Sequence, residues 1–308
     1  GLFSRVNVSL DWYTRTTKDL LMSKQLNSIS GFSSLLTNVG QMRNTGVELE
    51  VRSNNIKTKD FSWTTAFNLS HNKNKILKLA DLPWFVDGRY VRKEGYPFNT
   101  IYLREYAGVD PETGSALYYD NQQDENGNYT KNKVTDPGQA SPIPLKDITP
   151  TISGGFMNTF NYKFIDLSFN LSYSFGGYSY DNASYILQDD GYSVISNKST
   201  EQRRRWQKPG DITDVPRFVY GNKKGGNYNS SRAIHSTDHI RLKSLILGLN
   251  APKAWLQKLG IGNARIYFSG TNLLTWAAYG QYDPEMSGVV GFYTPPLKTY
   301  AFGLELKF

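Results

Sequence analysis

The sequence predicts an all-β fold, a transmembrane antiparallel β-barrel, from three observations. Polar and apolar residues alternate in repeated segments, long and short connections between these segments alternate, and the apolar residues are rich in aromatic rings. The 308 residues include 21 Tyr, 16 Phe and 6 Trp, although the apolar fraction is only 39% and the mean hydropathy is −0.51. No apolar run of about 18 residues is present, so no transmembrane helix is expected. A low apolar fraction and a negative mean hydropathy are compatible with barrel strands, because the lipid-facing and lumen-facing residues of such strands alternate.

The first segment shows the alternation clearly. Val8, Leu10 and Trp12 fall on one face of an extended chain, and Ser9 and Asp11 fall on the other. The same period of two recurs along the chain and predicts about eight strands. They lie at residues 6–12, 44–52, 61–70, 152–162, 165–175, 239–249, 264–269 and 300–308.

The segment that begins at residue 239 is less regular than the others. We assign Ile240, Leu242 and Ile246 to its apolar face, opposite Arg241 and Lys243. The alternation then degenerates over residues 245–249.

The lengths of the connections between strands distinguish an outer-membrane barrel from a soluble β-sheet domain. They cover approximately residues 17–43, 55–60, 73–150, 163, 177–238, 251–263 and 272–298, so long and short connections alternate. Outer-membrane barrels have short periplasmic turns and long extracellular loops. Connections this long are uncommon in compact soluble domains.

The two ends of the chain carry further expectations. The last strand is expected to run inward and to leave Phe308 at the periplasmic edge. Gly1 directly precedes a strand and is not expected to be the natural start of the protein.

The polar face carries charged residues that we place near its middle, at Glu48, Asp166 and Arg241. A wet lumen tolerates such charges, whereas Arg at the lipid midplane costs about 2–4 kcal/mol. Aromatic residues near the strand ends fit the interfacial girdles of barrels.

The last strand carries a second prediction. It alternates apolar residues and ends in an aromatic ring, which is the form that outer-membrane assembly machinery reads. Tyr300, Phe302 and Phe308 are therefore predicted as an assembly signal as well as lipid contacts.

Composition excludes several functional classes. The chain has no Cys, which excludes disulfides, thiolate metal sites and Cys nucleophiles. A net charge of +8 could indicate nucleic acid, but the one basic cluster, residues 203–205, lies in a stretch rich in Gly, Asn and Ser, so no nucleic-acid partner is expected. No nucleophile elbow, zinc-protease motif or phosphate loop appears, and no enzyme is predicted.

One acidic stretch contains residue types that can bind a cation. Asp120, Asp124, Asn126 and Asn128 could offer oxygen ligands to Ca²⁺. The bidentate Glu of an EF-hand is missing, and Asx residues around Gly127 favour a turn. No metal or cofactor is therefore predicted.

Several short motifs resemble one family. Residues 38–49, NVGQMRNTGVEL, resemble the N-x-G-x-x-x-N-x-G-V-E-L pattern of SusC-like TonB-dependent transporters. Residues 68–74, 205–211, 240–243, 272–274 with 283–285, and the tail 300–308 also fit that family, in order along the chain.

The resemblance implies a barrel of about 22 strands, which encloses a plugged lumen. Residues 1–308 would be its C-terminal part, about the last third of the wall. The plug, the earlier strands and the region that contacts the TonB complex would lie outside this chain. The family imports oligosaccharides, and in some members peptides, together with a SusD-like surface lipoprotein that closes over the extracellular mouth as a lid.

Substrate contacts are expected from aromatic side chains in the long loops. Flat rings pack against sugar C–H surfaces, while Asn and Asp side chains supply hydrogen bonds. The candidates are Trp84, Tyr90, Tyr118, Tyr119, Tyr178, Trp206 and Tyr282, with Phe85, Tyr180 and Tyr228 among the same loops. Packing of these rings against other loops, or against the lid protein, is the alternative for each of them.

Three functions remain open at this point. The first is an outer-membrane glycan importer, with an oligopeptide importer of the same family as its variant. The second is a self-contained eight-stranded adhesive or structural barrel, and the third is a soluble β-rich binding module. A bilayer and the outer-membrane assembly machinery are expected partners in the first two cases.

Overall fold

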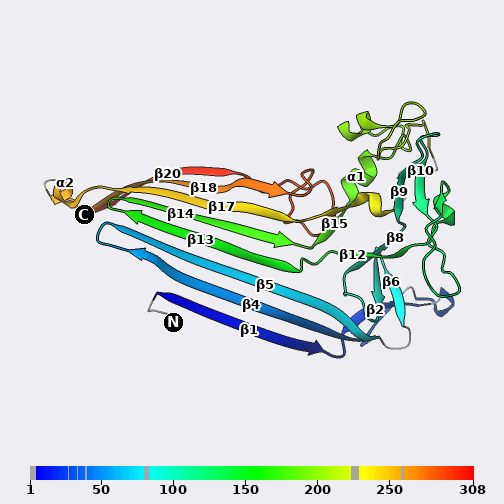
Figure 1. Cartoon of the computed structure of the whole chain (residues 1–308), viewed down its shortest axis with the longest axis horizontal. Helices are drawn as coiled ribbons and strands as arrows, with labels where there is room; N and C mark the ends of the chain where they lie inside the picture. The colour runs from blue at the N-terminus through cyan, green and yellow to red at the C-terminus, as the bar shows by residue number, and fades with distance from the viewer. Residues whose placement is uncertain are drawn as a thin grey trace.

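The computed structural model describes residues 5–26, 28–32, 34–38, 40–79, 83–222, 229–257 and 260–308. Its main feature is one long antiparallel sheet of eight strands, which are hydrogen-bonded in their order along the chain (Figure 1). The strands are β1 (Val6–Thr17), β4 (Gly40–Lys57), β5 (Phe61–Leu79), β13 (Ile152–Tyr162), β14 (Ile165–Phe175), β17 (His239–Asn250), β18 (Asn263–Ala277) and β20 (Thr299–Lys307). The predicted antiparallel strands are confirmed, although β4 and β5 reach further toward the long loops than their alternation predicts.

Short and long connections lie at opposite ends of the sheet (Figure 1). At one end, β13 and β14 are joined through Lys163, which has a φ of 51°, and β17 and β18 through the short helix α2 (Lys253–Gln257). Both chain ends lie at this side. The other end carries every long connection of the described chain. This segregation confirms the alternation of loop lengths that the sequence predicts.

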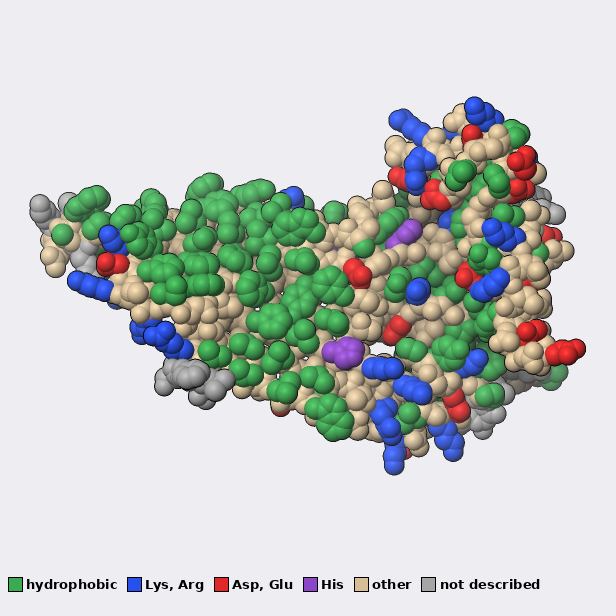
Figure 2. Space-filling model, viewed as in Figure 1, with side chains coloured by type: hydrophobic (Ala, Val, Ile, Leu, Met, Phe, Trp, Pro, Cys, Tyr) green, Lys and Arg blue, Asp and Glu red, His purple; other side chains and the backbone are tan. Residues whose placement is uncertain are grey.

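The two faces of the sheet differ in chemistry. Neighbouring strands align apolar residues into rows, such as Val8 opposite Val51, Val51 opposite Phe67, and Phe67 opposite Phe156. Figure 2 shows the resulting apolar surface over the strands, while charged side chains gather at the loop end. Trp12 is 71% exposed on this face. A continuous apolar surface of this kind marks contact with lipid or with another protein.

No helix among the residues that the structure describes is both long and apolar enough to cross a membrane.

A β-bulge explains the irregular segment in β17. Leu242 pairs with Leu171, and the next paired residue, Ser244, lies opposite Asn170, so Lys243 is the extra residue. An inserted residue reverses which positions face each side. Ile246, opposite Ser168, therefore belongs to the polar face, and its assignment to the apolar face was wrong.

The charges of the polar face lie mostly toward the ends of the strands. Asp166 is the second residue of β14 and Arg241 the third of β17, so only Glu48 lies near the middle of its strand. Asp166 accepts hydrogen bonds from Arg265 Nη2 at 2.6 Å and from Asn250 Nδ2 at 2.9 Å. The prediction of a charged middle is corrected for these two residues, because Asp166 pairs across strands beside the short turns, whereas Arg241 pairs with Asp283 of the last long loop.

Small sheets build the loop end. A four-stranded sheet runs in the order β12 (Ile143–Asp147), β8 (Thr100–Leu103), β7 (Tyr90–Lys93) and β6 (Trp84–Asp87). One three-stranded sheet runs in the order β11 (Lys133–Val134), β10 (Ala116–Tyr119) and β9 (Tyr106–Val109). Another runs in the order β16 (Ile234–Ser236), β15 (Tyr178–Asp181) and β19 (Gly288–Val290). A two-stranded sheet pairs β2 (Leu21–Gln25) with β3 (Ser34–Asn38). Short helices complete it: η1 (Ser28–Ser30), η2 (Pro137–Gln139), α1 (Asn182–Leu187), η3 (Thr200–Arg204) and η4 (Ser231–Ala233).

The buried core lies mainly among these loops. One cluster joins Ile101 and Leu103 to Tyr180 and Ala233, which come from widely separated connections. A second joins Ala116, Tyr118 and Ala140. The long connections therefore pack into an ordered assembly on one end of the sheet.

Candidate functional site

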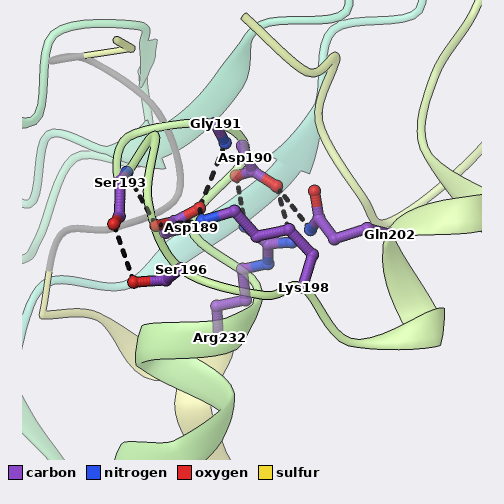
Figure 3. Close-up of polar contacts among 8 residues, drawn as sticks. All are labelled: Asp189, Asp190, Gly191, Ser193, Ser196, Lys198, Gln202 and Arg232. Carbon is purple, nitrogen blue, oxygen red and sulfur yellow. Dashed lines mark hydrogen bonds and ion pairs between the residues drawn. The ribbon is translucent and has the colours of Figure 1, made fainter. Parts of the chain in front are cut away.

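The candidate functional site is the loop assembly at the end of the sheet that carries the long connections, together with the adjacent polar face. A cluster of two adjacent carboxylates, Asp189 and Asp190, anchors the long connection between β14 and β17 (Figure 3). Asp190 has no exposed surface and accepts two hydrogen bonds from Arg232, at 2.5 and 3.1 Å, and one from Gln202 Nε2 at 2.9 Å. Asp189 accepts hydrogen bonds from Lys198 Nζ at 2.7 Å and from the backbone N–H of Gly191 at 3.1 Å.

This cluster pairs each buried acid with a cation. Burial lowers the pKa of Arg232, but the facing Asp190 carboxylate outweighs it and raises that pKa above its ordinary value. A buried charge is tolerated only when it is paired and hydrogen-bonded. The cluster therefore holds together segments from η3, η4 and the turn after α1.

A second ionic network joins the polar face of the wall to the last long loop. Arg241 Nη2 lies 2.6 Å from Oδ2 of Asp283, and their side chains are only 2% and 8% exposed. Glu285 lies 3.3 Å from Arg241 Nη1 and 2.6 Å from Lys243 Nζ. Residues 240–243 and 283–285, two of the motifs that the sequence singles out, are thus direct partners in space.

A cavity of about 600 Å³ adjoins this network. Its wall includes Arg241, Asp283 and Tyr282, with Phe292 and Tyr293 on the same loop. The Tyr282 hydroxyl is hydrogen-bonded to Ser179, and its ring centroid lies 5.2 Å from that of Tyr279. Of the predicted substrate contacts, Tyr282 is the one that lines this cavity.

A second cavity, of about 440 Å³, lies beside the four-stranded loop sheet. Trp84, another predicted contact, lines it, is 45% exposed, and has its ring centroid 5.9 Å from that of Tyr102. Burial first, and then the neighbouring Tyr129, raise the pKa of Tyr102 above its usual value. Three consecutive amide side chains complete much of the wall: Asn121, Gln122 and Gln123.

The other predicted aromatic residues are held by the loops themselves. Tyr118 has no exposed surface and packs edge-on against Tyr106, with a centroid distance of 5.8 Å. Its ring offers no face to a substrate, because it fills the core of the β9–β10–β11 sheet. Trp206 donates from Nε1 to the Pro111 carbonyl at 2.8 Å. Its ring lies so close to Gly114, whose φ is 69°, that no side chain would fit there.

Tyr90, Tyr119 and Tyr178 are partly buried and lie beside cations. The centroids of their rings are 5.4 Å from Arg92 Cζ, 5.1 Å from Lys131 Nζ and 5.0 Å from Lys146 Nζ, respectively. The fold thus brings Trp84 and Tyr282 to cavities and the other five candidates to packing positions. Phe85 packs against the cluster formed by Met22, Ile76 and Leu79, Tyr180 is 1% exposed, and Tyr228 lies outside the described residues.

The stretch considered for Ca²⁺ forms a turn. Asp124 accepts hydrogen bonds from the backbone N–H groups of Asn126 and Asn128, at 2.9 and 2.8 Å, and these bonds lower its pKa. Asp120 accepts from Thr130 and Asn132. These oxygens are therefore engaged by donors of the same loop.

The residues of the predicted assembly signal lie on the outer edge of the sheet. Tyr300 and Phe302, in β20, are 61% and 84% exposed and pack beside Phe268, with centroid distances of 6.3 and 5.3 Å. Phe308 follows β20 and is 88% exposed. Their role in assembly remains a prediction.

Sequence reasoning missed the amides of the second cavity and the buried ionic residues Asp190 and Arg232. The run of amides from residue 121 to 123 follows the aromatic end of β10 after one intervening residue, Asp120, and this is the signal that could have pointed to the cavity. No local signal pairs Asp190 with Arg232, because they are 42 residues apart.

Taken together, the fold and the site define part of the wall of a transmembrane barrel with its outer loops. Comparison with known proteins gives the family. TonB-dependent receptor P3 of Formosa agariphila is 33% identical over 336 residues, which cover 99% of this chain and 32% of that protein. TonB-dependent receptor SusC of Bacteroides thetaiotaomicron is 28% identical over 328 residues, covering 100% of this chain and 30% of that protein. No family model matches the chain.

A solved structure described as the RagAB peptide transporter matches with a TM-score of 0.86 and 31% identity, covering 99% of this chain and 34% of that one. The chain therefore spans about a third of the length of the relatives that it matches. It is a barrel segment of the SusC/RagA-like TonB-dependent receptors, a non-enzymatic family of outer-membrane transporters of Gram-negative bacteria. The resemblance that the sequence motifs indicate is confirmed.

Proposed function

We propose that this chain forms part of the wall and the extracellular loops of a TonB-dependent importer of oligosaccharides. The observation that carries the proposal is the eight-stranded sheet with an apolar face (Figure 2), a fold that the RagAB structure matches over 99% of this chain. In a barrel, the apolar face contacts lipid and the polar face borders the lumen.

In this proposal, residues 1–308 are the C-terminal part of a barrel of about 22 strands. A closed barrel of eight strands has an interior that side chains just fill, which leaves no path for a large solute. The relatives are about three times as long as the matched segment, which is enough for a plug, further strands and a region that contacts the TonB complex. Strands β1 and β20 each pair on one side only in the described chain, and further strands would satisfy those edges.

A SusD-like surface lipoprotein is the proposed partner at the extracellular end. Large apolar side chains project from the outer loop that Asp190 anchors, with Ile195, Ile212 and Tyr220 being 94%, 98% and 80% exposed. Such side chains are typical of the apolar centre of a protein interface. The inner-membrane proton gradient would supply energy through TonB.

Oligosaccharides are the proposed substrates because the cavity beside Trp84 combines aromatic rings with neutral amides. Peptides are the second candidate, and the 0.86 TM-score to a structure named as a peptide transporter favours them. Both are large polar solutes, so wall architecture alone does not separate them.

Uptake by the intact transporter tests the proposal. A strain lacking the gene is grown on neutral oligosaccharides of several linkages and on peptides of matched length, with and without the gene restored. We expect restored growth on at least one oligosaccharide, and loss of that growth when TonB is inactivated. Restoration on peptides alone would replace the glycan assignment by the peptide one, and restoration on neither class would overturn the import function.

A further inference from the structure

The cavity beside Trp84 is built from parts of the chain that are distant in sequence. Trp84 comes from β6, Tyr102 from β8, and Asn121, Gln122 and Gln123 from the segment that follows β10. Its volume, about 440 Å³, falls within the range of about 300–1,000 Å³ that is usual for small-molecule sites. Its described lining residues include none from the eight strands of the wall and neither Arg241 nor Asp283.

The floor of the cavity is buried and its rim is exposed. Val91 has no exposed surface, and Asn121 is 2% exposed. At the edge, Trp84 and Tyr129 are 45% and 37% exposed, and Gln122 and Gln123 are exposed as well, so a molecule entering the cavity meets both rings and amides. This combination of rings and amides suits a ligand with both C–H faces and hydroxyl groups.

Asn121 is fixed in place by the loop around it. Its φ is 49°, a left-handed conformation that Asn tolerates better than most residues. Its Oδ1 accepts a hydrogen bond from Lys131 Nζ at 3.0 Å, whereas its Nδ2 has no hydrogen-bond partner among the residues that the structure describes. A buried donor without a partner is uncommon in folded proteins, and an acceptor from a bound molecule would satisfy it.

The neighbouring amides are also oriented by the loop. Gln122 Nε2 donates to Ser141 Oγ at 3.2 Å, and Gln123 lies opposite Tyr129 in an isolated bridge. Amide side chains can both donate and accept, as sugar hydroxyls do. The described lining residues include no carboxylate and one cation, Lys93, whose Nζ lies 5.0 Å from the centroid of the Tyr96 ring.

We infer that this cavity is a binding subsite for a neutral sugar unit, with the Trp84 ring packing on the sugar and the amides of residues 121–123 binding its hydroxyls. The inference rests on the proposed import of oligosaccharides, and it assigns the first contact of the substrate to the outer loops. Anionic sugars and peptides are the competing ligands, because Lys93 could bind a carboxylate and amides could bind a peptide backbone.

The test uses the intact purified transporter in detergent and saturation-transfer NMR. The probes are maltohexaose, cellohexaose, laminarihexaose and mannohexaose as neutral sugars, hexagalacturonate as the anionic sugar, and hexa-alanine as the peptide. The variants are Trp84→Ala and Gln122→Ala. Trp255→Ala is the matched control, since Trp255 is 68% exposed in α2, at the opposite end of the sheet (Figure 1).

We expect at least one neutral hexasaccharide to bind, with affinity falling at least tenfold in Trp84→Ala and severalfold in Gln122→Ala, and staying unchanged in Trp255→Ala. Equal binding by all variants would overturn the assignment of the cavity. Binding of hexagalacturonate or hexa-alanine in preference to the neutral sugars would overturn the assigned ligand class, and so would binding of no probe. Thermal unfolding of each variant shows whether it is folded.

Failure of this inference is distinguishable from failure of the proposed function. Neutral-sugar uptake that is unaffected by Trp84→Ala leaves the import function intact and removes the subsite. Trp84-dependent binding without uptake supports the subsite and contradicts import.

Discussion

Arg241 and Asp283, 42 residues apart in sequence, form a buried ion pair in which Nη2 lies 2.6 Å from Oδ2. One belongs to the third position of a wall strand and the other to the loop after β18. The pair therefore ties the last long loop to the polar face of the barrel wall, and it places Tyr282 beside the larger cavity.

Replacing Arg241 by Ala leaves the buried Asp283 carboxylate without its main partner. Loss of one member of a buried pair costs about 3–5 kcal/mol. We expect a decrease of that order in the free energy of unfolding, measured by urea titration in detergent or lipid. Lys243→Ala removes from Glu285 a cation whose side chain is 34% exposed, and it should cost less than about 1 kcal/mol. Equal effects of the two substitutions would contradict the role of the buried pair.

Arginine substitutions at Leu247 and Ile246 test which face of β17 contacts lipid. Leu247 pairs with Leu167 and Phe268 on the apolar face, whereas Ile246 pairs with Ser168 and Ser269. Arg at the lipid midplane costs about 2–4 kcal/mol and less toward the interfaces, so we expect Leu247→Arg to cost about 2 kcal/mol. Ile246→Arg, its matched control, should cost clearly less. The opposite ranking, in the same unfolding experiment, would mean that the bulge at Lys243 does not reverse the faces.

The burial of His235 predicts that the stability of the loop sheet formed by β15, β16 and β19 depends on pH. Its ring stacks on Tyr279 with a centroid distance of 3.7 Å, and burial lowers its pKa below the ordinary 6.5, although Asp181 acts in the opposite direction. The unfolded loop therefore binds more protons than the folded one below about pH 6.5. Stability should be fully present above that pH and decline as the pH falls below it.

Hydrogen exchange measured by mass spectrometry at pH 7.5 and pH 5.5, with rates corrected for intrinsic exchange, checks this prediction. Peptides covering residues 178–181 and 234–236 should lose protection at the lower pH. His235→Phe, which keeps a flat ring against Tyr279, should show little change. Identical pH dependence in the two proteins would assign the effect to other groups.

Phe308→Ala tests the predicted assembly signal. Because Phe308 is 88% exposed beyond β20, its removal should not reduce the stability of the barrel once it has assembled. We expect severalfold less heat-modifiable protein in the outer membrane, and an unchanged unfolding midpoint for the fraction that assembles. Phe164→Ala is the control, because Phe164 is 47% exposed in the turn between β13 and β14. A wild-type amount of assembled Phe308→Ala protein would remove this residue from the signal.

Much of the wall could be predicted because strand alternation is a local property. Side chains in extended backbone point alternately to opposite faces, so residues such as Val8 and Ser9 report their own environment. The bulge at Lys243 could not be predicted in this way. It depends on the register with β14 and β18, and Ile246 was therefore assigned to the wrong face.

The candidate site was predicted less completely. The loop aromatics were identified as a group, but burial separates them, since Tyr118 has no exposed surface while Trp84 is 45% exposed. Composition does not distinguish a ring that fills a loop core from one that lines a cavity. That difference depends on which distant segment packs against each ring.

The sequence by itself determined that the chain forms about eight alternating strands, that long loops gather at one end, and that one face is apolar, because each follows from local period and spacing. Only the tertiary structure decided which residues meet across those loops: Arg241 with Asp283, Asp190 with Arg232, and Trp84 with the amides of residues 121–123. The physical reason is that pairing across long connections depends on packing and on the burial of charge, and neither is encoded in the neighbouring residues alone.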